Sequence, residues 1–204
     1  MIGALLAPPL CWSCGATAPR GRALCRGCRG GLVFLPPEPV LVAGVRIWAP
    51  VAYEGPARDL VRALKFHGAL SLASEMAAIA VASAPAGLLR GALVPVPLHP
   101  VRLRRRGFNQ AAVLASEIAR RTDPGSSHCL RRHGPGPPQV GRTRAARLTG
   151  PAGSIEPCGR APPVALIVDD VVTTGATLAA CAAALREAGA KEVAAIAFAR
   201  TPGR

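Results

Sequence analysis

Apolar residues follow two patterns along this chain: short continuous runs, and longer stretches at helical spacing. The continuous runs are bounded by small or polar residues and predict strands at 45–53, 91–96 and 164–168. The helical spacing predicts helices at 56–66, 70–83, 108–121 and 178–189. Strands that alternate with helices in this way are typical of a parallel sheet flanked by helices. The sequence therefore predicts an α/β fold.

The predicted strand at 164–168 leads directly into polar residues that carry chemistry. Two carboxylates come first, Asp169 and Asp170, and a small hydroxyl-rich turn follows, formed by Thr173, Thr174, Gly175, Ala176 and Thr177. A helix N-terminus favours anions because its first N–H groups lack internal partners and its dipole is positive there. The carboxylates can accept hydrogen bonds from a vicinal diol. The run therefore predicts a site for a ribose 5-phosphate; the alternative is a plain corner in which Asp and Thr only cap the helix.

A second polar segment follows the predicted strand at 91–96. In a doubly wound sheet, the loops after the strands meet at one edge, where ligands bind. Guanidinium groups match phosphate oxygens in paired hydrogen bonds, so this loop is suited to a pyrophosphate. The alternative is a solvated basic turn. The candidate anion-binding residues are Arg102, Arg104, Arg105, Arg106, Asn109 and Gln110.

Composition agrees with an anionic partner. The chain has 204 residues and a formal net charge of +14, and eleven arginines against Glu117 and Asp123 give a net +9 between Pro100 and Gly150. Such a balance suits nucleic acid, a phosphorylated substrate, or both. Half of the chain is hydrophobic but only 3% is aromatic, which predicts a core of small side chains and little base stacking.

Four cysteines near the N-terminus have the spacing of a metal site. Cys11 and Cys14 form one pair, Cys25 and Cys28 form a second, and ten residues separate the pairs. Two such pairs supply four thiolates for a tetrahedral zinc ion in a closed, structural site. Disulfides are the alternative, and they would require an oxidising compartment. The other three cysteines, Cys129, Cys158 and Cys181, lack a partner at metal spacing, and Cys181 is predicted to be a small core residue.

Proline and glycine divide the chain into segments. We expect a zinc-ribbon-like segment at 1–35, a Pro-rich linker at 36–44, and one larger domain at 45–204 with a mobile loop at about 122–163. No apolar run reaches the roughly 20 residues of a membrane span. The apolar start lacks the basic residues of a secretory signal. A cytoplasmic protein without membrane insertion is therefore expected.

Several motifs together resemble the ComF family, the competence-associated phosphoribosyltransferase-like proteins. The segments Val94–Gln110 and Val164–Thr177 carry most of the resemblance. Shorter matching segments are Tyr53–Pro56, Leu64–Gly68 and Pro137–Gly141, the last followed by Arg144 and Arg147. In that family a four-cysteine zinc ribbon precedes the domain, so the resemblance covers nearly the whole chain.

The resemblance implies a type I phosphoribosyltransferase fold and a ligand. Asp169 and Asp170 would hold the ribose hydroxyls of phosphoribosyl pyrophosphate, or of a related nucleotide, and the turn at 173–177 would cradle its 5-phosphate. Mg²⁺ would accompany the pyrophosphate. A mobile hood would close over the substrate, with candidates Gln139, Arg142, Arg144 and Arg147.

Three functions stay open at this point. The first is an enzyme that transfers phosphoribosyl to an unknown nucleobase-like acceptor, in the competence and DNA-uptake context that the resemblance implies. The second is a non-catalytic accessory protein that binds the phosphoribosyl ligand or single-stranded DNA. This alternative is kept because Gly150 stands where the family has asparagine, three residues after Arg147. The third is a zinc ribbon that docks a competence protein or another partner.

Lys65 also has two open interpretations: it is either a solvated cation in the last turn of its helix or a substrate-facing cation.

Overall fold

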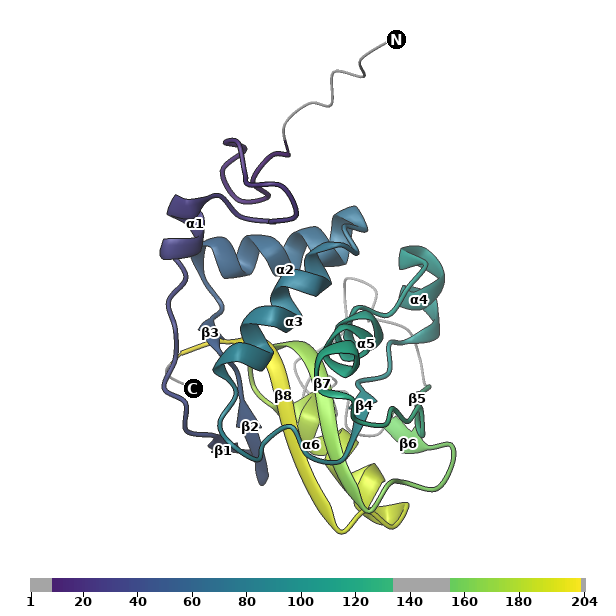
Figure 1. Cartoon of the computed structure of the whole chain (residues 1–204). Coiled ribbons are helices and arrows are strands. Elements are labelled where there is room, and N and C mark those ends of the chain that lie inside the picture. The colour runs from purple at the N-terminus through teal and green to yellow at the C-terminus, as the bar shows by residue number, and fades with distance from the viewer. Residues whose placement is uncertain (1–8, 134–154, 203–204) are drawn as a thin grey trace, which may run out of the picture.

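A six-stranded sheet forms the centre of the protein in our computed structural model, which describes residues 9–133 and 155–202 (Figure 1). The strand order is β1-β2-β8-β7-β4, and β3 also pairs with β8. All pairings are parallel except that of β1 with β2. The strands are β1 (Val40–Val42), β2 (Val45–Trp48), β3 (Val51–Ala52), β4 (Ala92–Pro95), β7 (Val164–Val172) and β8 (Glu192–Arg200). The predicted α/β fold with a mostly parallel sheet is therefore confirmed.

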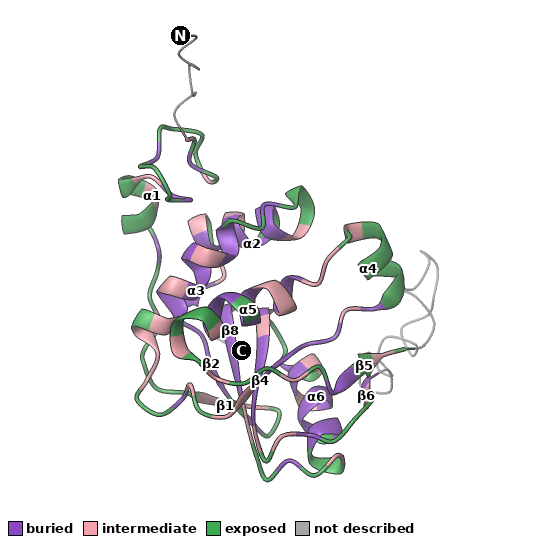
Figure 2. Ribbon diagram, turned by 45° about the vertical axis from the view of Figure 1, so that its right-hand side comes forward, coloured by how far each residue is buried: buried purple, intermediate pink, exposed green. Residues whose placement is uncertain are grey.

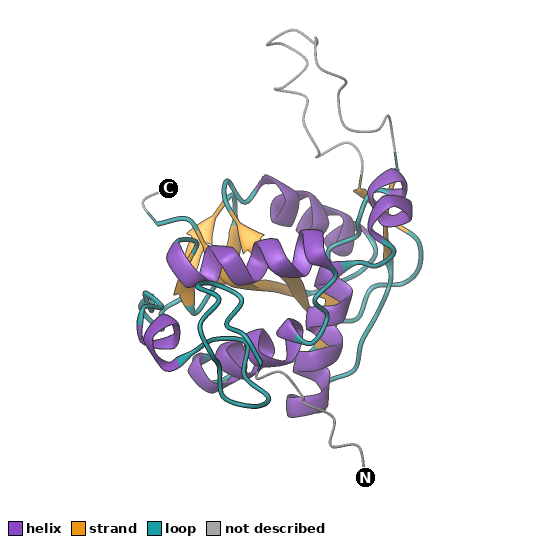
Figure 3. Ribbon diagram, turned by 90° about the horizontal axis from the view of Figure 1, so that it is seen from above, coloured by secondary structure: helices purple, strands orange, loops and turns teal. Residues whose placement is uncertain are grey.

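Helices cover both faces of this sheet (Figures 2 and 3). One apolar cluster joins one face of the sheet to α2 (Gly55–His67), α3 (Leu72–Ser83) and α5 (Gln110–Thr122). A second cluster joins the other face to α6 (Ala176–Glu187). Two short helices, α1 (Arg26–Gly30) and α4 (Pro100–Arg106), lie outside these layers (Figure 1).

The two central strands are buried on both faces, which explains their near-continuous apolar sequence. Strand β8 contributes small side chains, including Ala195, Ala197 and Ala199, and two large buried ones, Ile196 and Phe198. Alanines let the helices approach the sheet closely, so the predicted core of small side chains is confirmed. Strand β8 itself was absent from the sequence-based expectation.

The N-terminal segment packs on the main domain rather than standing apart from it. Its buried residues Cys11, Leu24 and Leu32 belong to the same apolar cluster as α2 and α3. Glu75 of α3 is buried, accepts a hydrogen bond from the backbone N–H of Ala23, and pairs with Arg29. This carboxylate interrupts the apolar run of its helix because it anchors the N-terminal segment.

The chain between the two predicted domains joins the edge of the sheet. Residues 33–35 run beside β3, where Ala52 N–H donates to the carbonyl of Val33 and Leu35 N–H to that of Pro50, at 2.9 and 2.8 Å. Strand β1 then lies within the stretch 36–44 that was predicted to be a linker, and it turns back into β2. The linker segment thus contributes to the sheet.

Three further segments differ from the prediction. The strand expected at 45–53 is two strands, β2 and β3, separated at Ala49 and Pro50. The segment at 122–163 contains a two-stranded ribbon of β5 (Leu130–Arg132) and β6 (Ile155–Pro157). The arginine-rich loop is the helix α4, because Pro100 suits its first turn, the His99 side chain accepts from Val101 N–H at 3.2 Å, and Gly107 ends it in the left-handed conformation.

Among the residues that the structure describes, no helix has both the length and the apolar character needed to cross a membrane.

Candidate functional site

The acidic pair lies at the carboxyl edge of the sheet. Strand β7 continues past the predicted strand end at Val168, so Asp169 and Asp170 belong to the strand rather than follow it. The neighbouring strand β4 ends with Pro95 opposite Val168. The pair therefore extends one step beyond its neighbour, at the edge where parallel α/β sheets bind ligands.

Asp170 is held by an ion pair with α2. Its Oδ2 atom lies 2.7 Å from Nζ of Lys65, and the two side chains are only 2% and 19% exposed, respectively. Apart from this ion pair, Oδ2 makes no hydrogen bond within the described residues. Lys65 lies in the last turn of α2 as predicted, but its ion pair with the buried Asp170 shows that it is not a freely solvated cation.

We expect Lys65→Met to destabilise the protein by about 2–4 kcal/mol, because Asp170 would be left buried without its counter-charge. Chemical denaturation measures this loss. Arg62→Met, on the exposed surface of the same helix, is the matched control and should change stability by less than about 0.5 kcal/mol. A double variant, Lys65→Met with Asp170→Asn, should recover much of the loss. Equal losses for the two single methionine variants would contradict the assigned ion pair.

Asp169 is the carboxylate that stays available to a ligand. It is half-buried, and its Oδ1 atom accepts a hydrogen bond from Asp170 N–H at 2.9 Å. Burial raises the pKa of Asp169 well above its ordinary value, and the adjacent Asp170 carboxylate raises it further. A carboxyl group whose pKa is raised by burial beside a second carboxylate is typical of a functional site rather than of a stabilising contact.

The turn after the acidic pair leads into α6 as predicted. Gly175 precedes the helix with φ of 75°, in the left-handed region. Thr173 and Thr174 are exposed, Thr177 is half-buried, and Thr174 Oγ1 accepts from Ala176 N–H at 3.4 Å. The turn therefore presents hydroxyl groups and the start of a twelve-residue helix beside Asp169.

Gly175 is required for two independent reasons. Its positive φ is costly for any other residue, and a Cβ atom here would lie 2.5 Å from Cγ1 of Val42 in β1. We expect Gly175→Ala to lower the free energy of unfolding by at least about 1–2 kcal/mol, the cost of the backbone conformation alone. Gly159→Ala is the control, because Gly159 has open space around it and no positive φ. Urea denaturation of the two variants measures their free energies of unfolding. A Gly175→Ala variant as stable as the wild type would contradict this description of the turn.

Of the predicted anion-binding arginines, Arg106 is half-buried and contacts Phe66 and Gln110. Its guanidinium carbon lies 5.7 Å from the ring centre of Phe66, and Nη1 donates to Gln110 Oε1. Burial lowers the pKa of Arg106, while the nearby charge of Asp170 raises it. Arg102, Arg104 and Arg105 are exposed on the same short helix, and the charges of Arg102 and Arg105 also lower the pKa of Arg106.

Asn109 and Gln110, also predicted to bind an anion, have structural contacts here. Asn109 Oδ1 accepts from Ala111 N–H at 3.0 Å and thereby caps α5, and its Nδ2 donates to the carbonyl of Val96 at 2.9 Å. Gln110 is buried and accepts from Arg106. Both side chains fix the connection between β4, α4 and α5.

Arg132 of β5 is a cation near the site that sequence reasoning did not single out. Burial lowers the pKa of Arg132, Arg102 lowers it further, and Cys181 and Asp169 raise it. Cys181 is fully buried in α6, as predicted, and burial raises its pKa to about 12. The pattern around Arg132 gave no signal, because it is one of several arginines in a stretch rich in glycine and proline.

The predicted hood residues Gln139, Arg142, Arg144 and Arg147 lie outside the described residues. Their contacts with the acidic pair therefore stay a prediction.

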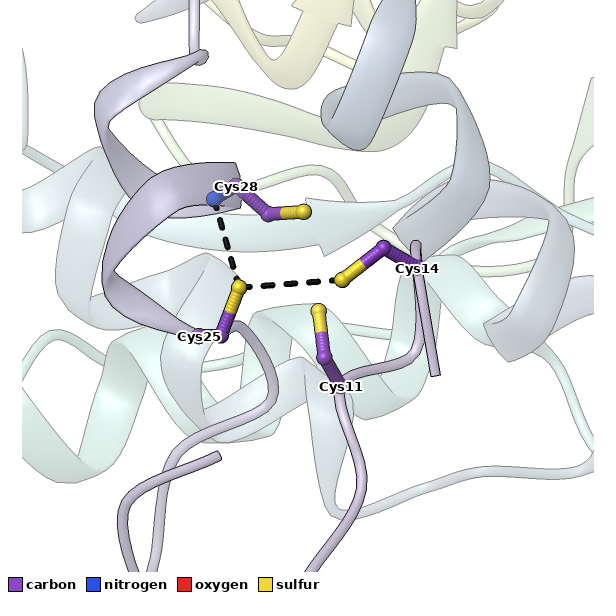
Figure 4. A group of neighbouring side chains, drawn as sticks. All are labelled: Cys11, Cys14, Cys25 and Cys28. Carbon is purple, nitrogen blue, oxygen red and sulfur yellow. Dashed lines mark hydrogen bonds between the residues drawn. The ribbon is translucent and has the colours of Figure 1, made fainter. Parts of the chain in front are cut away.

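The four N-terminal cysteines converge on one point (Figure 4). Their sulfur atoms all lie within 4.8 Å of one another, and Cys14 Sγ is 3.7 Å from Cys25 Sγ. A tetrahedral zinc ion with Zn–S bonds of about 2.3 Å separates its sulfur ligands by about 3.8 Å, whereas a disulfide requires about 2.05 Å. All four thiols are free. The cluster is therefore consistent with a zinc ribbon.

The surroundings shift the pKa values of Cys11 and Cys28 in opposite directions. Burial raises the pKa of Cys11, but backbone hydrogen bonds at Cys14, Cys25 and Ser13 outweigh it and lower that pKa to about 6. Burial and hydrogen bonding among the neighbouring thiols raise the pKa of Cys28 to about 12. A metal ion that binds here must displace protons, so its affinity depends on pH.

The N-terminal segment that carries the four cysteines packs on α2, the helix that also supplies Lys65. Ser13 Oγ donates to Asp59 Oδ2 of α2 at 2.7 Å, and the rings of Trp12 and His67 lie 6.5 Å apart. The cysteine cluster and the acidic pair are thus connected through α2.

Comparison with known proteins agrees with the C-terminal part of this site. Residues 163–204 match the model of the phosphoribosyl transferase domain family. The match contains β7, the acidic pair, the hydroxyl-rich turn, α6 and β8. No curated protein matches the chain. The match covers about a fifth of the sequence, and together with the α/β architecture it supports a phosphoribosyltransferase-type family for this chain.

Proposed function

We propose that this protein binds phosphoribosyl pyrophosphate with Mg²⁺ and transfers its phosphoribosyl group to a nucleobase-like acceptor, on a type I phosphoribosyltransferase domain. The observation that carries the proposal is the run from β7 into α6. It combines a half-buried carboxylate, three threonines and a helix N-terminus within the residues that match the phosphoribosyl transferase domain.

Each part of the run has a role in the proposal. Asp169 accepts hydrogen bonds from the ribose hydroxyls, and the turn at 173–177 donates to the 5-phosphate. Asp170 is engaged by Lys65 and acts as a support that fixes the end of β7. Burial makes the ionised form of Asp169 unfavourable, and hydrogen bonds from the ribose hydroxyls or a bound cation would offset this cost.

The basic residues around the acidic pair suit the departing pyrophosphate. Arg106 and Arg132 are both partly desolvated, and Arg102 lies close enough to lower the pKa of each. Cations in such a place stabilise charge that develops on a leaving group more strongly than solvated ones do. Mg²⁺, which prefers oxygen ligands and keeps several waters, would neutralise the pyrophosphate, with Asp169 the available protein carboxylate.

Pyrophosphate release tests the activity directly. The purified protein is incubated with phosphoribosyl pyrophosphate, Mg²⁺ and a panel of nucleobases, and pyrophosphate and nucleotide products are quantified. The proposal predicts base-dependent release that requires Mg²⁺ and is lost in Asp169→Asn. Tight ligand binding without turnover for any base would reject the transfer step and leave a binding function.

A second candidate, a single-stranded DNA accessory protein acting in natural transformation, is favoured by one surface. Trp12 and Phe66 are 44% and 63% exposed, and both lie near the C-terminal end of α2. Arg106 lies over the Phe66 ring, and Arg62 is exposed nearby. Exposed aromatic rings among arginines suit stacked bases and their phosphates, although the sequence alone predicted little stacking.

Fluorescence anisotropy with a labelled oligonucleotide tests this candidate. Affinity should fall steeply with salt and should weaken roughly 5- to 100-fold in Phe66→Ala, the range for one lost stacking contact. Val101→Ala, another exposed apolar residue, is the control. In the native host, deletion of the gene should reduce DNA uptake if the competence link holds. Affinity that is unchanged by salt or by Phe66→Ala would reject the candidate.

A further inference from the structure

A basic cavity lies at the end of the sheet opposite to the acidic pair. It has a volume of about 480 Å³ and is lined at the amino ends of β2, β7 and β8 by residues that include Arg46, Val164 and Glu192. Val164 lies five positions before Asp169 along strand β7, which corresponds to about 17 Å. The cavity is therefore distinct from the candidate phosphoribosyl site.

Four cations from separate parts of the chain line this cavity: Arg46, Arg90, Arg186 and Lys191. Within 9–133 and 155–202, none of the four forms an ion pair. Among the described residues, Glu192 is the one carboxylate in the lining, so these residues give a local charge balance of +3. Cations without counter-ions around a concave surface create a field that attracts a multiply charged anion.

The backbone holds Arg90 in this position. Gly87 has φ of 76°, and a Cβ atom there would lie 3.3 Å from Arg90 Nε, so the guanidinium group rests against the glycine. Gly91 packs directly on the start of β7, where a Cβ atom would lie 2.3 Å from the carbonyl oxygen of Val164. Leu88 between them is buried. The segment 87–91 is thus fitted to the sheet rather than free in solvent.

The lining indicates the class of ligand. Three guanidinium groups on separate elements can each bind a different phosphate group, which favours a chain of phosphates over a single one. Ala165, Val193 and Ala194 add small apolar surface that a sugar or base can contact. The volume falls in the range of small-molecule sites, about 300–1,000 Å³.

We propose that this cavity binds a polyphosphate-bearing small molecule of the nucleoside triphosphate class, at a site separate from the acidic pair. Neither the four-cysteine cluster nor the phosphoribosyl site takes part. The proposal is independent of phosphoribosyl transfer and would stand if that activity failed.

Calorimetry of the full chain with ATP and with inorganic tripolyphosphate, at about 150 mM salt, tests the proposal. Arg90→Glu combined with Arg186→Glu should weaken saturable binding at least about tenfold, because two phosphate contacts are lost. Arg20→Glu combined with Arg58→Glu changes the net charge equally at exposed positions outside the cavity. This control pair and Asp169→Asn should each change the affinity by less than about twofold.

Circular dichroism spectra and thermal transitions that match those of the wild type establish that the variants are folded. If the glutamate substitutions disturb folding, Arg90→Gln combined with Arg186→Gln replaces them in the binding experiment. The site is supported if ATP or tripolyphosphate binding is weakened by the Arg90 and Arg186 substitutions but not by the controls. If ATP binds more tightly than tripolyphosphate, the nucleoside contributes to binding. Three results overturn it: no saturable binding, equal weakening by both charge-reversed pairs, or loss in Asp169→Asn alone. An oligonucleotide that requires Arg90 and Arg186 while ATP fails to saturate also overturns it.

Discussion

Asp169→Asn should weaken the binding of phosphoribosyl pyrophosphate and at the same time stabilise the free protein. The pKa of Asp169 is raised chiefly by burial, so its ionised form destabilises the folded state at neutral pH. Asparagine keeps the acceptor for Asp170 N–H without the charge. Affinity should fall roughly 10- to 100-fold, since a charge-assisted hydrogen bond worth about 1.5–3 kcal/mol is lost.

The pH dependence of this stabilisation follows from the direction of the shift. Between the ordinary aspartate value of about 3.9 and the raised pKa of Asp169, the folded state keeps a proton that the unfolded chain has released. Stability of the wild type therefore falls as pH rises through that interval. The advantage of Asp169→Asn should grow as pH rises toward the raised pKa of Asp169, and it should vanish below about pH 4.

Asp123→Asn is the control for this variant, because Asp123 is exposed at the end of α5 and far along the chain from β7. It should leave ligand affinity unchanged. Thermal melting across pH and ligand calorimetry give the two readouts. A destabilised Asp169→Asn with normal affinity would contradict the account, since Asp169 would then be a structural residue.

Cys25→Ser should remove the metal and loosen the N-terminal segment. A closed four-thiolate site binds about one zinc per chain, and loss of one ligand opens the tetrahedral site to solvent. The segment also contributes Cys11, Leu24 and Leu32 to the core that contains α2. We therefore expect metal content near zero, together with a lower melting temperature of the whole protein rather than local unfolding alone.

Cys158→Ser provides the matched control, because this exposed thiol lies outside the cysteine cluster. Elemental analysis and thermal denaturation distinguish the two variants. Full metal content in Cys25→Ser would contradict the zinc assignment. A normal melting temperature after metal loss would contradict our conclusion that the N-terminal segment shares one hydrophobic core with α2.

The parts of the fold that sequence predicted share one property: their signals are local. The buried strand before Asp169, the helical spacing in α2 and the paired cysteines each depend on residues a few positions apart. The carboxyl-edge position of the acidic pair also followed, because parallel α/β sheets bind ligands there.

The parts that sequence could not predict depend on contacts between distant segments. The pairing of Lys65 with Asp170 joins α2 to β7, and Glu75 holds a segment more than forty residues earlier in the chain. Strand β1 appeared to be a linker because proline precedes it, yet it packs against Gly175. The charge of Asp169 affects Arg132 because the β5–β6 ribbon packs against α6, the helix that follows the acidic pair. No local pattern encodes these neighbours.

Calorimetric titration of the wild-type protein with phosphoribosyl pyrophosphate, with and without Mg²⁺, tests the central claim most directly. The account predicts one saturable site per chain that requires Mg²⁺ and is weakened in Asp169→Asn but not in Asp123→Asn. The contrary result is an absence of saturable heat at millimolar ligand with Mg²⁺, or an affinity identical in wild type and Asp169→Asn.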